Sequence, residues 1–236
     1  MCGRYSLTDC EEKIIFYFGL HNSKVILKPR YNIYPSEKIP IIVQRDGLLQ
    51  LEFMKWGLIP IWSKSRKPFI NARVETIKEK PSFRQAIKKR RCLVPANGFY
   101  EWTQEKYNKQ PYFICLKNYN LLAFAGIWEE WISDNGEVIR TCAILTTAAN
   151  SSILKIHNRM PIILNKNNFS MWLNFSEISL KEFYENSQSD ILKTWKVDKK
   201  ISSTYFDNPN CIKKIEDNII PSDNKIFSRA QETLFD

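Results

Sequence analysis

Short runs of apolar, β-branched and aromatic residues recur along the chain, and Gly, Pro, Asn or Asp residues bound most of them. Such runs are typical of β-strands. They predict strands over residues 39–45, 48–54, 111–117, 121–128, 138–146 and 161–165. Two hairpins are expected, across residues 45–47 (RDG) and 133–136 (SDNG), because Asp-Gly and Asn-Gly pairs accept the positive φ angles of tight turns.

Helical patterns are fewer and shorter. Residues 9–20 (DCEEKIIFYFGL) predict a helix that Asp9 caps and that ends at Gly19, with two glutamates suited to its first turn. Further short helices are expected over 82–91, 150–156 and 179–186. We therefore expect an α+β fold: mostly antiparallel strands form a mixed sheet with a barrel-like core, and a few short helices flank it.

The pattern contains no repeat of fixed period and no Pro-rich or Gly/Ser-rich linker that would mark a domain boundary. One domain is therefore expected over residues 1–220. The sequence turns polar near its end, which predicts a flexible tail over residues 221–236. A monomer is the default expectation.

Composition adds a positive charge to this picture. The 236 residues include 35 Lys and Arg against 25 Asp and Glu, a formal net charge of +10. Such a balance favours a polyanionic partner, because bound cations release the counterions of nucleic acid. Charge alone is equally compatible with a basic protein that binds no nucleic acid.

Several other classes of protein are disfavoured. No apolar run approaches the length of a membrane span, and the N-terminus lacks the pattern of a signal peptide, so we expect a cytoplasmic protein with no membrane contact. The six cysteines are scattered without a CxxC pair, which favours reduced thiols. With only His21 and His157 available, we predict no metal and no other cofactor.

Cys2 is the first candidate for chemistry. If Met1 is removed, Cys2 carries a thiol and an α-amine on adjacent carbons, with reference pKa values of about 8.5 and about 7.7–8.0. A 1,2-aminothiol condenses with an aldehyde, first to an imine through nitrogen and then, by attack of sulfur, to a five-membered thiazolidine. Position alone leaves open that Cys2 is second in the chain without a function.

Three segments, residues 71–76 (NARVET), 95–102 (PANGFYEW) and 156–161 (IHNRMP), place polar groups beside apolar ones. Desolvation between Tyr100 and Trp102 would raise the pKa of Glu101 toward that of a general acid or base. An exposed turn carboxylate is the alternative. His157 fits a proton shuttle and a structural histidine equally well.

Basic residues with interleaved aromatic ones would suit a nucleic-acid groove, in which cations follow the phosphates and rings stack on bases. Core tryptophans and a solvated helix face are the alternative. The residues concerned are Arg4, Trp56, Trp62, Lys64, Arg66, Arg73 and Lys88 to Arg91.

The chain also carries, in this order, the segments 1–4 (MCGR), 29–33 (PRYNI), 56–60 (WGLIP), 71–76 (NARVET), 91–96 (RCLVPA), 98–102 (GFYEW), 124–129 (FAGIWE) and 156–161 (IHNRMP). Together they resemble the SOS response-associated peptidase family, whose members shield abasic sites in single-stranded DNA by covalent crosslinking. The match spans about residues 1 to 175. Residues 196–213 depart from the family's usual Val-Asn element.

The resemblance implies four catalytic residues. Cys2 becomes residue one and forms the thiazolidine with the ring-opened sugar. Asn71 is similar to the asparagine that orients the new linkage, and Glu101 to the glutamate that handles protons during imine formation. His157 resembles the histidine that assists opening of the sugar ring. An associated strand-cleaving lyase activity and removal of Met1 by the protein itself are part of the same expectation.

The resemblance also implies a DNA-binding set. Arg4, Arg73 and Arg159 correspond to phosphate-binding arginines. Pro35 and Trp62 resemble members of an apolar wedge against the bases that flank the lesion, and Thr146 a backbone contact. Such a narrow wedge would favour a kinked single strand over a duplex.

The last six residues, QETLFD, lie outside this match. They resemble the Gln-x-x-Leu-Phe peptides that dock on the bacterial sliding clamp, with Gln231, Leu234 and Phe235 as the contact residues. A flexible tail that offers two apolar side chains is a recurring mode of recruitment. A tail without a partner is the alternative.

Three functions therefore stand beside one another. The first is a covalent sensor of abasic sites in single-stranded DNA. The second is a cysteine peptidase that acts on other proteins, since Cys2, His157 and Asn71 could assemble in space. The third is a module that binds single-stranded DNA without a covalent bond.

Overall fold

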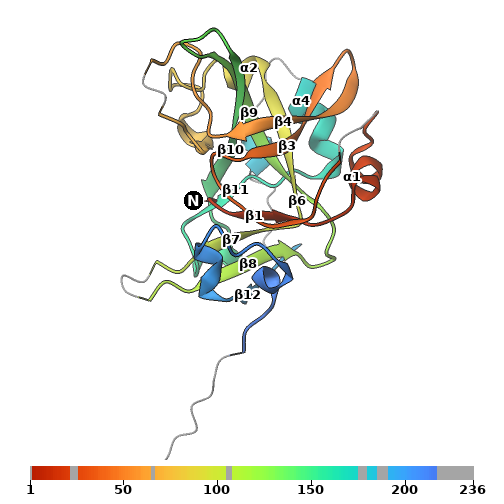
Figure 1. Ribbon diagram of the computed structural model, residues 1–236, viewed down its shortest axis with the longest axis vertical. Coiled ribbons are helices and arrows are strands. Elements are labelled where there is room, and N and C mark those ends of the chain that lie inside the picture. The colour runs from red at the N-terminus through yellow and green to blue at the C-terminus, as the bar shows by residue number, and fades with distance from the viewer. Residues whose placement is uncertain are drawn as a thin grey trace, which may run out of the picture.

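The computed structural model describes residues 2–21, 26–64, 67–104, 108–174, 180–184 and 191–216. Two sheets and a few short helices make up this part of the chain, and the expected α+β fold is confirmed (Figure 1). The helices are α1 (Glu11–Phe18), α2 (Ala86–Lys89), α3 (Ser151–Leu154), α4 (Phe169–Asn174) and α5 (Lys181–Tyr184).

The larger sheet closes on itself. Strand β10 (Val138–Ala148) pairs in parallel with β4 (Leu48–Trp56), which continues through β3 (Lys38–Arg45) and β6 (Arg91–Ala96) to β9 (Leu122–Ile132). Because β9 also pairs with β10, the ring of strands is complete. Full closure leaves no free edge within the ring, and the barrel-like core expected from the strand pattern is confirmed.

Both predicted hairpins are present. Strands β3 and β4 join at Asp46 and Gly47, whose φ angles are 49° and 80°. Positive φ at both central residues is the type I′ geometry that matches the twist of the flanking strands. Strands β9 and β10 join across the second predicted turn, where Gly136 has a φ of 82° and its N–H donates to the Ser133 carbonyl.

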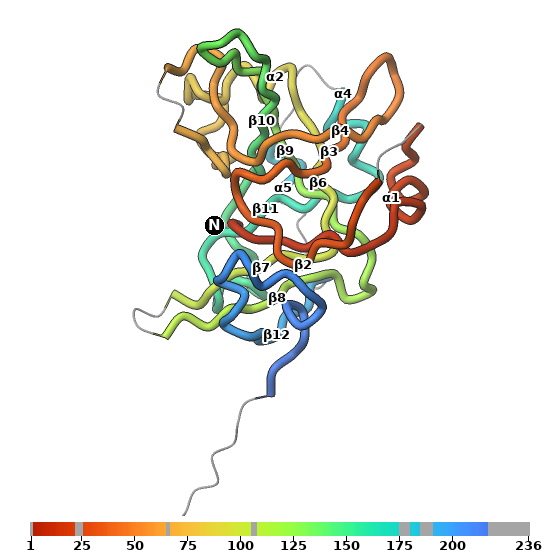
Figure 2. The backbone as a smooth tube through the Cα atoms, viewed as in Figure 1, coloured from red at the N-terminus to blue at the C-terminus, as the bar shows by residue number. Residues whose placement is uncertain are grey.

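The smaller sheet carries the N-terminus. Its order is β12 (Leu192–Lys196), β8 (Pro111–Leu116), β7 (Gly98–Trp102), β1 (Tyr5–Leu7) and β2 (Arg30–Ile33). Chain segments that are distant in sequence therefore lie side by side (Figure 2). The pairing of Tyr5 with Phe99 places the residues before β1 next to β7, the strand that contains Glu101.

Two short strands extend β10 at its far end. Strand β5 (Asn71–Arg73) runs parallel to β10 from Ile144 to Thr146, and β11 (Arg159–Pro161) pairs antiparallel with β10 from Thr146 to Ala148. The C-terminal end of β10 thus pairs with residues 71–73 and with residues 159–161, which are far apart in the sequence. The 3₁₀ helix η1 (Val74–Thr76) follows β5 directly.

The short elements correct several predictions. Asp9 does not cap α1: the N-cap is Cys10, and the Asp9 carboxylate instead pairs with Lys13 and accepts from Asn97. The predicted end at Gly19 is confirmed, with a left-handed φ of 66°. The helix expected over 82–91 is shorter than predicted: only α2 (Ala86–Lys89) forms, and Arg91 already begins β6.

The strand predicted over 161–165 is wrong, because β11 ends at Pro161 and only Ile163 forms an isolated bridge, with Phe124. Helix α3 falls within the predicted range 150–156 and is capped by the Asn150 side chain. Within the helix expected over 179–186, the structure describes residues 180–184, and α5 lies there. The tail predicted over 221–236 lies outside the described residues. No described helix is long and apolar enough to cross a membrane.

Candidate functional site around Cys2

Cys2 is fully buried, three residues before the start of β1 at Tyr5. The Asn71 side-chain Nδ2 donates a hydrogen bond of 2.9 Å to the Cys2 carbonyl. The Oδ1 atom of Asn71 is buried and has no hydrogen-bond partner among the described residues. The Nδ2 atom of the carboxamide therefore holds the backbone at Cys2. Its Oδ1 atom can accept a hydrogen bond from a donor that enters the site.

Glu101 supplies a carboxyl group to the same place. It is 2% exposed on β7, on the strand face opposite to Tyr100 and Trp102, and burial raises the pKa of Glu101 to about 7. The N-terminal ammonium group, through its charge and a hydrogen bond, and the backbone N–H of Trp102 oppose this shift. A carboxyl with a pKa near 7 can both accept and donate a proton at neutral pH. The desolvation expected from the sequence is therefore present.

The thiol of Cys2 is protonated in this environment. Burial raises the pKa of Cys2 well above its ordinary value, the charge of Glu101 raises it further, and the N-terminal ammonium group opposes both. An activated thiolate nucleophile needs the opposite shift. The site therefore favours chemistry that begins at the amine and involves the sulfur second.

His157 lies half-buried between α3 and β11. Its Nδ1 atom accepts a 2.9 Å hydrogen bond from the backbone N–H of Arg159, so the neutral ring carries its proton on Nε2. Burial lowers the pKa of His157, and the positive N-terminus lowers it further. The lowered pKa keeps the imidazole neutral at physiological pH.

Arg4, two residues after Cys2, is held by three contacts. Its Nη1 donates to Asn32 Oδ1 at 2.9 Å, its Nη2 donates to the Ser202 carbonyl at 3.0 Å, and the guanidinium lies 5.3 Å from the centre of the Tyr34 ring. These contacts fix a cation two residues from Cys2. The adjacent Pro35 is partly exposed in the turn between β2 and β3.

The other two predicted phosphate ligands differ from each other. Arg73 is exposed on β5, two residues after Asn71. Arg159 is instead occupied: its Nη1 and Nη2 atoms contact the two carboxylate oxygens of Glu75 at 2.5 and 3.0 Å. Nη2 also donates to the carbonyl and hydroxyl oxygens of Thr146, at 2.6 and 3.2 Å.

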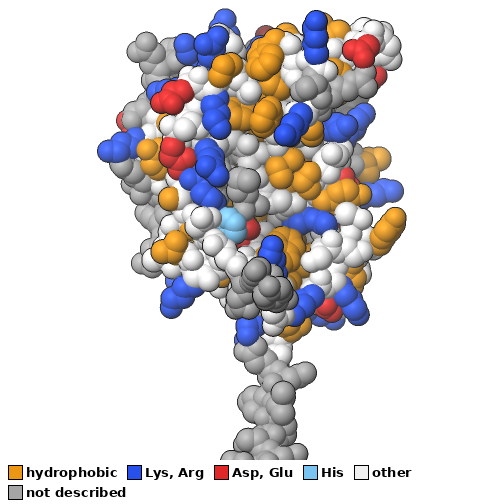
Figure 3. Space-filling view, turned by 90° about the vertical axis from the view of Figure 1, so that its left-hand side faces the viewer, with side chains coloured by type: hydrophobic (Ala, Val, Ile, Leu, Met, Phe, Trp, Pro, Cys, Tyr) orange, Lys and Arg blue, Asp and Glu red, His pale blue; other side chains and the backbone are white. Residues whose placement is uncertain are grey.

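Trp62 lies on the loop between β4 and β5 with 61% of its surface exposed, so its ring is available to a partner and does not belong to the core. Trp56, by contrast, is fully buried and donates to the Ile70 carbonyl, which is the core role left open for it above. Figure 3 views the molecule from the side on which Figure 1 marks the N-terminus. Lys and Arg side chains gather on this face, above and below a histidine.

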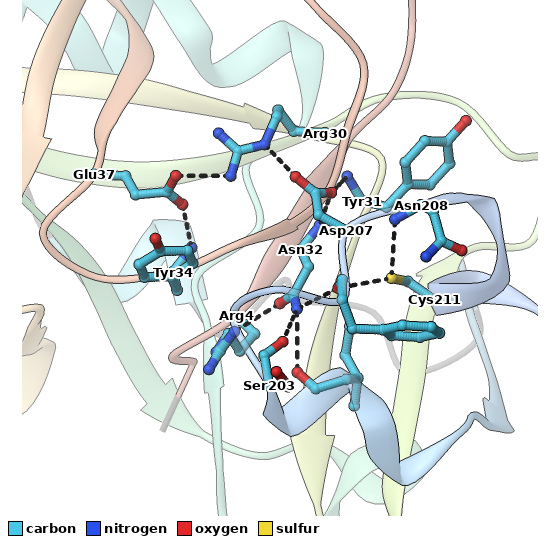
Figure 4. A network of polar contacts seen from close by, with 12 residues as sticks. Arg4, Arg30, Tyr31, Asn32, Tyr34, Glu37, Ser203, Asp207, Asn208 and Cys211 are labelled. Carbon is cyan, nitrogen blue, oxygen red and sulfur yellow. Dashed lines mark hydrogen bonds and ion pairs between the residues drawn. The ribbon is translucent and has the colours of Figure 1, made fainter.

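Sequence reasoning missed a second polar network, between β2 and the segment 198–212 (Figure 4). Asp207 accepts from the backbone N–H groups of Tyr31 and Asn32 at 2.6 and 2.9 Å, and from Arg30 Nε at 2.5 Å. The buried Asn32 carboxamide donates to three carbonyls of the segment, those of Ile201, Ser203 and Phe206. This segment departs from the family pattern in sequence, yet the PRYNI motif anchors it firmly next to Arg4.

The described residues contain no group of three or more His, Cys, Asp or Glu side chains that could hold a metal ion. All six cysteines are free thiols. The predicted clamp-binding residues Gln231, Leu234 and Phe235 lie outside the described part of the chain.

A closed barrel and a second sheet that buries a cysteine at position 2 beside a carboxamide and a carboxyl define a class of protein, which comparison with known proteins identifies. The model of the SOS response associated peptidase (SRAP) family matches residues 1–204. The chain belongs to this family.

Its relatives include the abasic site processing protein YoqW of Bacillus subtilis (strain 168), with 37% identity over 90% of this chain and 99% of YoqW. The abasic site processing protein HMCES of Gallus gallus is 31% identical, over 80% of this chain and 67% of HMCES. A crystal structure of a protein from Bacteroides thetaiotaomicron superposes with a TM-score of 0.81 and 31% identity, covering 91% of this chain and 100% of that one.

Proposed function

We propose that this protein recognises abasic sites in single-stranded DNA and bonds covalently to them through Cys2 once Met1 is removed. The observation that carries the proposal is the burial of Cys2 beside Asn71 and beside a Glu101 carboxyl whose pKa is about 7. Membership of the SRAP family and similarity to the abasic site processing proteins YoqW and HMCES support abasic DNA as the substrate and a role in DNA repair.

The chemistry follows from the positions of these groups. After removal of Met1 the N-terminal amine belongs to Cys2. Glu101 as a carboxylate takes a proton from this amine, which attacks C1 of the ring-opened sugar. Glu101 as an acid then protonates the hydroxyl that leaves as water, which gives an imine.

The thiol of Cys2 next adds to the imine carbon, and its proton passes to nitrogen, so that aldehyde and aminothiol give a thiazolidine and one water. His157, neutral at physiological pH, assists proton transfer during opening of the sugar ring. The spare Oδ1 of Asn71 accepts a hydrogen bond from the nitrogen of the new linkage. Arg4, Arg73 and Arg159 bind phosphates in this proposal, and Pro35, Trp62 and Thr146 contact the strand beside the lesion.

A denaturing gel tests the proposal. Purified protein incubated with an abasic single-stranded oligonucleotide should give a band that survives denaturant, and Cys2→Ala or a retained Met1 should abolish it. Cys10→Ser is the matched control, because Cys10 is an exposed thiol outside the site. If no resistant band formed with Cys2 verified as the first residue, the proposal would be abandoned.

The imine also allows strand cleavage, so lyase activity belongs to the same proposal. Cys2→Ser keeps the amine, but its oxygen closes the five-membered ring less favourably than sulfur. We expect this variant to yield less crosslink and more cleaved strand than the parent protein on the same gel. An unchanged ratio of crosslinked to cleaved DNA would exclude a shared imine intermediate.

Peptidase activity is proposed here only as self-removal of Met1. A cysteine peptidase acting on other proteins would need a thiol whose pKa is lowered, and burial raises that of Cys2. Intact-mass spectra of Glu101→Gln and His157→Ala, compared with the parent, test self-removal. Met1 should persist in the variants if the site performs the reaction, and should be lost equally if an aminopeptidase does.

The tail proposal concerns recruitment. Leu234 and Phe235 would place the protein at replication forks by docking on the sliding clamp. A fluorescent peptide of residues 225–236 should bind the clamp in a polarisation assay, and the double change Leu234→Ala, Phe235→Ala should remove binding. Equal binding of both peptides would contradict the proposal.

A further inference from the structure

The turn at residues 203–206 exposes one aromatic ring completely. Tyr205 is 98% exposed, whereas its neighbour Phe206 packs against the buried cluster that contains Tyr100 and Phe113. Of these two adjacent aromatic side chains, one is packed and the other faces solvent. Packing in the core explains why an aromatic residue stands at position 206, but it does not explain one at position 205.

The backbone that carries Tyr205 is held on both sides. Asn32 Nδ2 donates to the carbonyls of Ser203 and Phe206 at 2.9 and 2.7 Å (Figure 4). Asp207 is tied to β2 by the bonds described above, and within the turn the Phe206 N–H donates to the Ser203 carbonyl. A ring presented from such a fixed turn loses little conformational freedom when it binds.

The turn lies beside the candidate site. Ser202, next to the turn, accepts the 3.0 Å hydrogen bond from Arg4 Nη2, and Arg4 is two residues from Cys2. Lys200 adds an exposed cation just before the turn. An exposed ring and an exposed cation thus lie within five residues of Ser202, the residue that Arg4 contacts, and Arg4 links this turn to the segment that contains the buried Cys2.

We infer that Tyr205 is a stacking platform for an unpaired base of the DNA strand that contains the lesion, with Arg4 and Lys200 next to the phosphates of that nucleotide. This inference rests on the proposed function and deepens it, because it adds a subsite beyond the abasic sugar. The combination favours nucleic acid over a protein partner: aromatic rings stack on any base, and cations follow the backbone.

Binding without crosslinking tests the platform. In a Cys2→Ala background, Tyr205→Ala should weaken binding of a single strand containing a tetrahydrofuran abasic analogue between about 5-fold and about 100-fold, the range for one stacked base. Tyr205→Phe keeps the ring and should bind as the parent does. Tyr119→Ala removes a different exposed ring, 66% exposed in the turn after β8, and should change nothing.

A fluorescent base such as 2-aminopurine, moved one position at a time along the strand, should be quenched at one position by the parent and by Tyr205→Phe only. The inference is overturned if Tyr205→Ala binds as tightly as the parent, if Tyr205→Phe loses as much as Tyr205→Ala, or if Tyr119→Ala loses equally. Tyr205 makes no core contact that its removal would disturb, and thermal unfolding of each variant checks this.

With Cys2 intact, Tyr205→Ala should crosslink fully at saturating DNA and need more DNA to reach half of that yield. If the parent forms no crosslink, the proposed function fails, while a loss of binding specific to Tyr205 still supports the platform. If the parent crosslinks and Tyr205→Ala behaves identically, only the platform fails.

Discussion

At the scale of single residues, Glu101 links the chemistry of the site to the stability of the fold. Burial raises its pKa from 4.5 to about 7. Because the folded-state pKa is the higher one, the stability linked to this carboxyl is complete below about pH 4.5 and is lost as the pH rises through 7. Wild-type protein above pH 7 thus retains a buried, desolvated carboxylate.

Glu101→Gln removes this ionisation. At pH 8 we expect the variant to be about 1–3 kcal/mol more stable than the parent in urea unfolding, and the difference should vanish near pH 4.5. Chains of the same variant that have lost Met1 should crosslink about 10²–10⁴-fold more slowly, the usual loss for a general acid or base. A stability difference that does not change with pH would contradict the account of Glu101.

Arg159 offers a second test. Its guanidinium group is expected to bind a phosphate, but in the structure it forms an ion pair with Glu75. Glu75→Gln should strengthen single-strand binding, because a phosphate then no longer has to displace the Glu75 carboxylate from Arg159. Glu79→Gln is the matched control, since it removes the same charge from an exposed position nearby. Equal changes in both variants would show only the general effect of charge.

The site residues were assigned through motifs, and physical reasoning from single residues could not have chosen them. The burial of Glu101 was foreseen, but the apolar neighbours named for it, Tyr100 and Trp102, pack on the opposite face of β7. The hydrogen bond from Asn71 to Cys2 was not foreseeable, because it requires β5 of the larger sheet to meet the segment that precedes β1 of the smaller sheet. The pairing of Arg159 with Glu75 likewise depends on the long β10 strand that brings both segments together.

At the scale of elements, hairpins whose turns have distinctive chemistry were predictable, and buried strands inside functional motifs were not. Strands β6 and β7 were missed because residues 91–102 are apolar almost throughout and lack the alternation of a half-buried strand. The three-residue strands β1, β5 and β11 are too short to leave a periodic signal.

Gly98 shows how closely β7 packs on β8. A Cβ atom at this position would lie 2.3 Å from Phe113 Cζ and 2.7 Å from the Ile114 carbonyl oxygen. Gly98→Ala should therefore destabilise the fold by about 3 kcal/mol in urea unfolding. Gly47→Ala, where the added atom meets nothing within 4 Å, should cost only the strain of positive φ, about 1–2 kcal/mol. Equal losses would contradict the packing argument.

The segment 198–212 depends on Asp207, which accepts three hydrogen bonds from β2. Asp207→Ala leaves two backbone N–H groups without this acceptor and should release the segment. Hydrogen exchange of residues 198–212 should accelerate strongly, while exchange in β9 and β10 stays slow. Uniform acceleration across the barrel would show instead that Asp207 supports the fold as a whole.

At the scale of the whole molecule, the formal net charge of +10 favours binding of a polyanion such as single-stranded DNA. Single-strand affinity should fall with salt at a logarithmic slope near −0.7 for each phosphate contacted. Arg4→Ala and Arg73→Ala should each reduce the slope by about one contact in a titration followed by fluorescence anisotropy. A flat response of the parent protein would contradict the assignment of these arginines.

The central claim is that Cys2 reacts only as the first residue, through both its amine and its thiol. Intact-mass spectrometry of the protein after incubation with an abasic single strand tests this most directly. The account predicts one adduct, equal in mass to the protein without Met1 plus the oligonucleotide minus one water, and none with Cys2→Ala. An adduct on chains that retain Met1, or no adduct on chains that begin with Cys2, would contradict it.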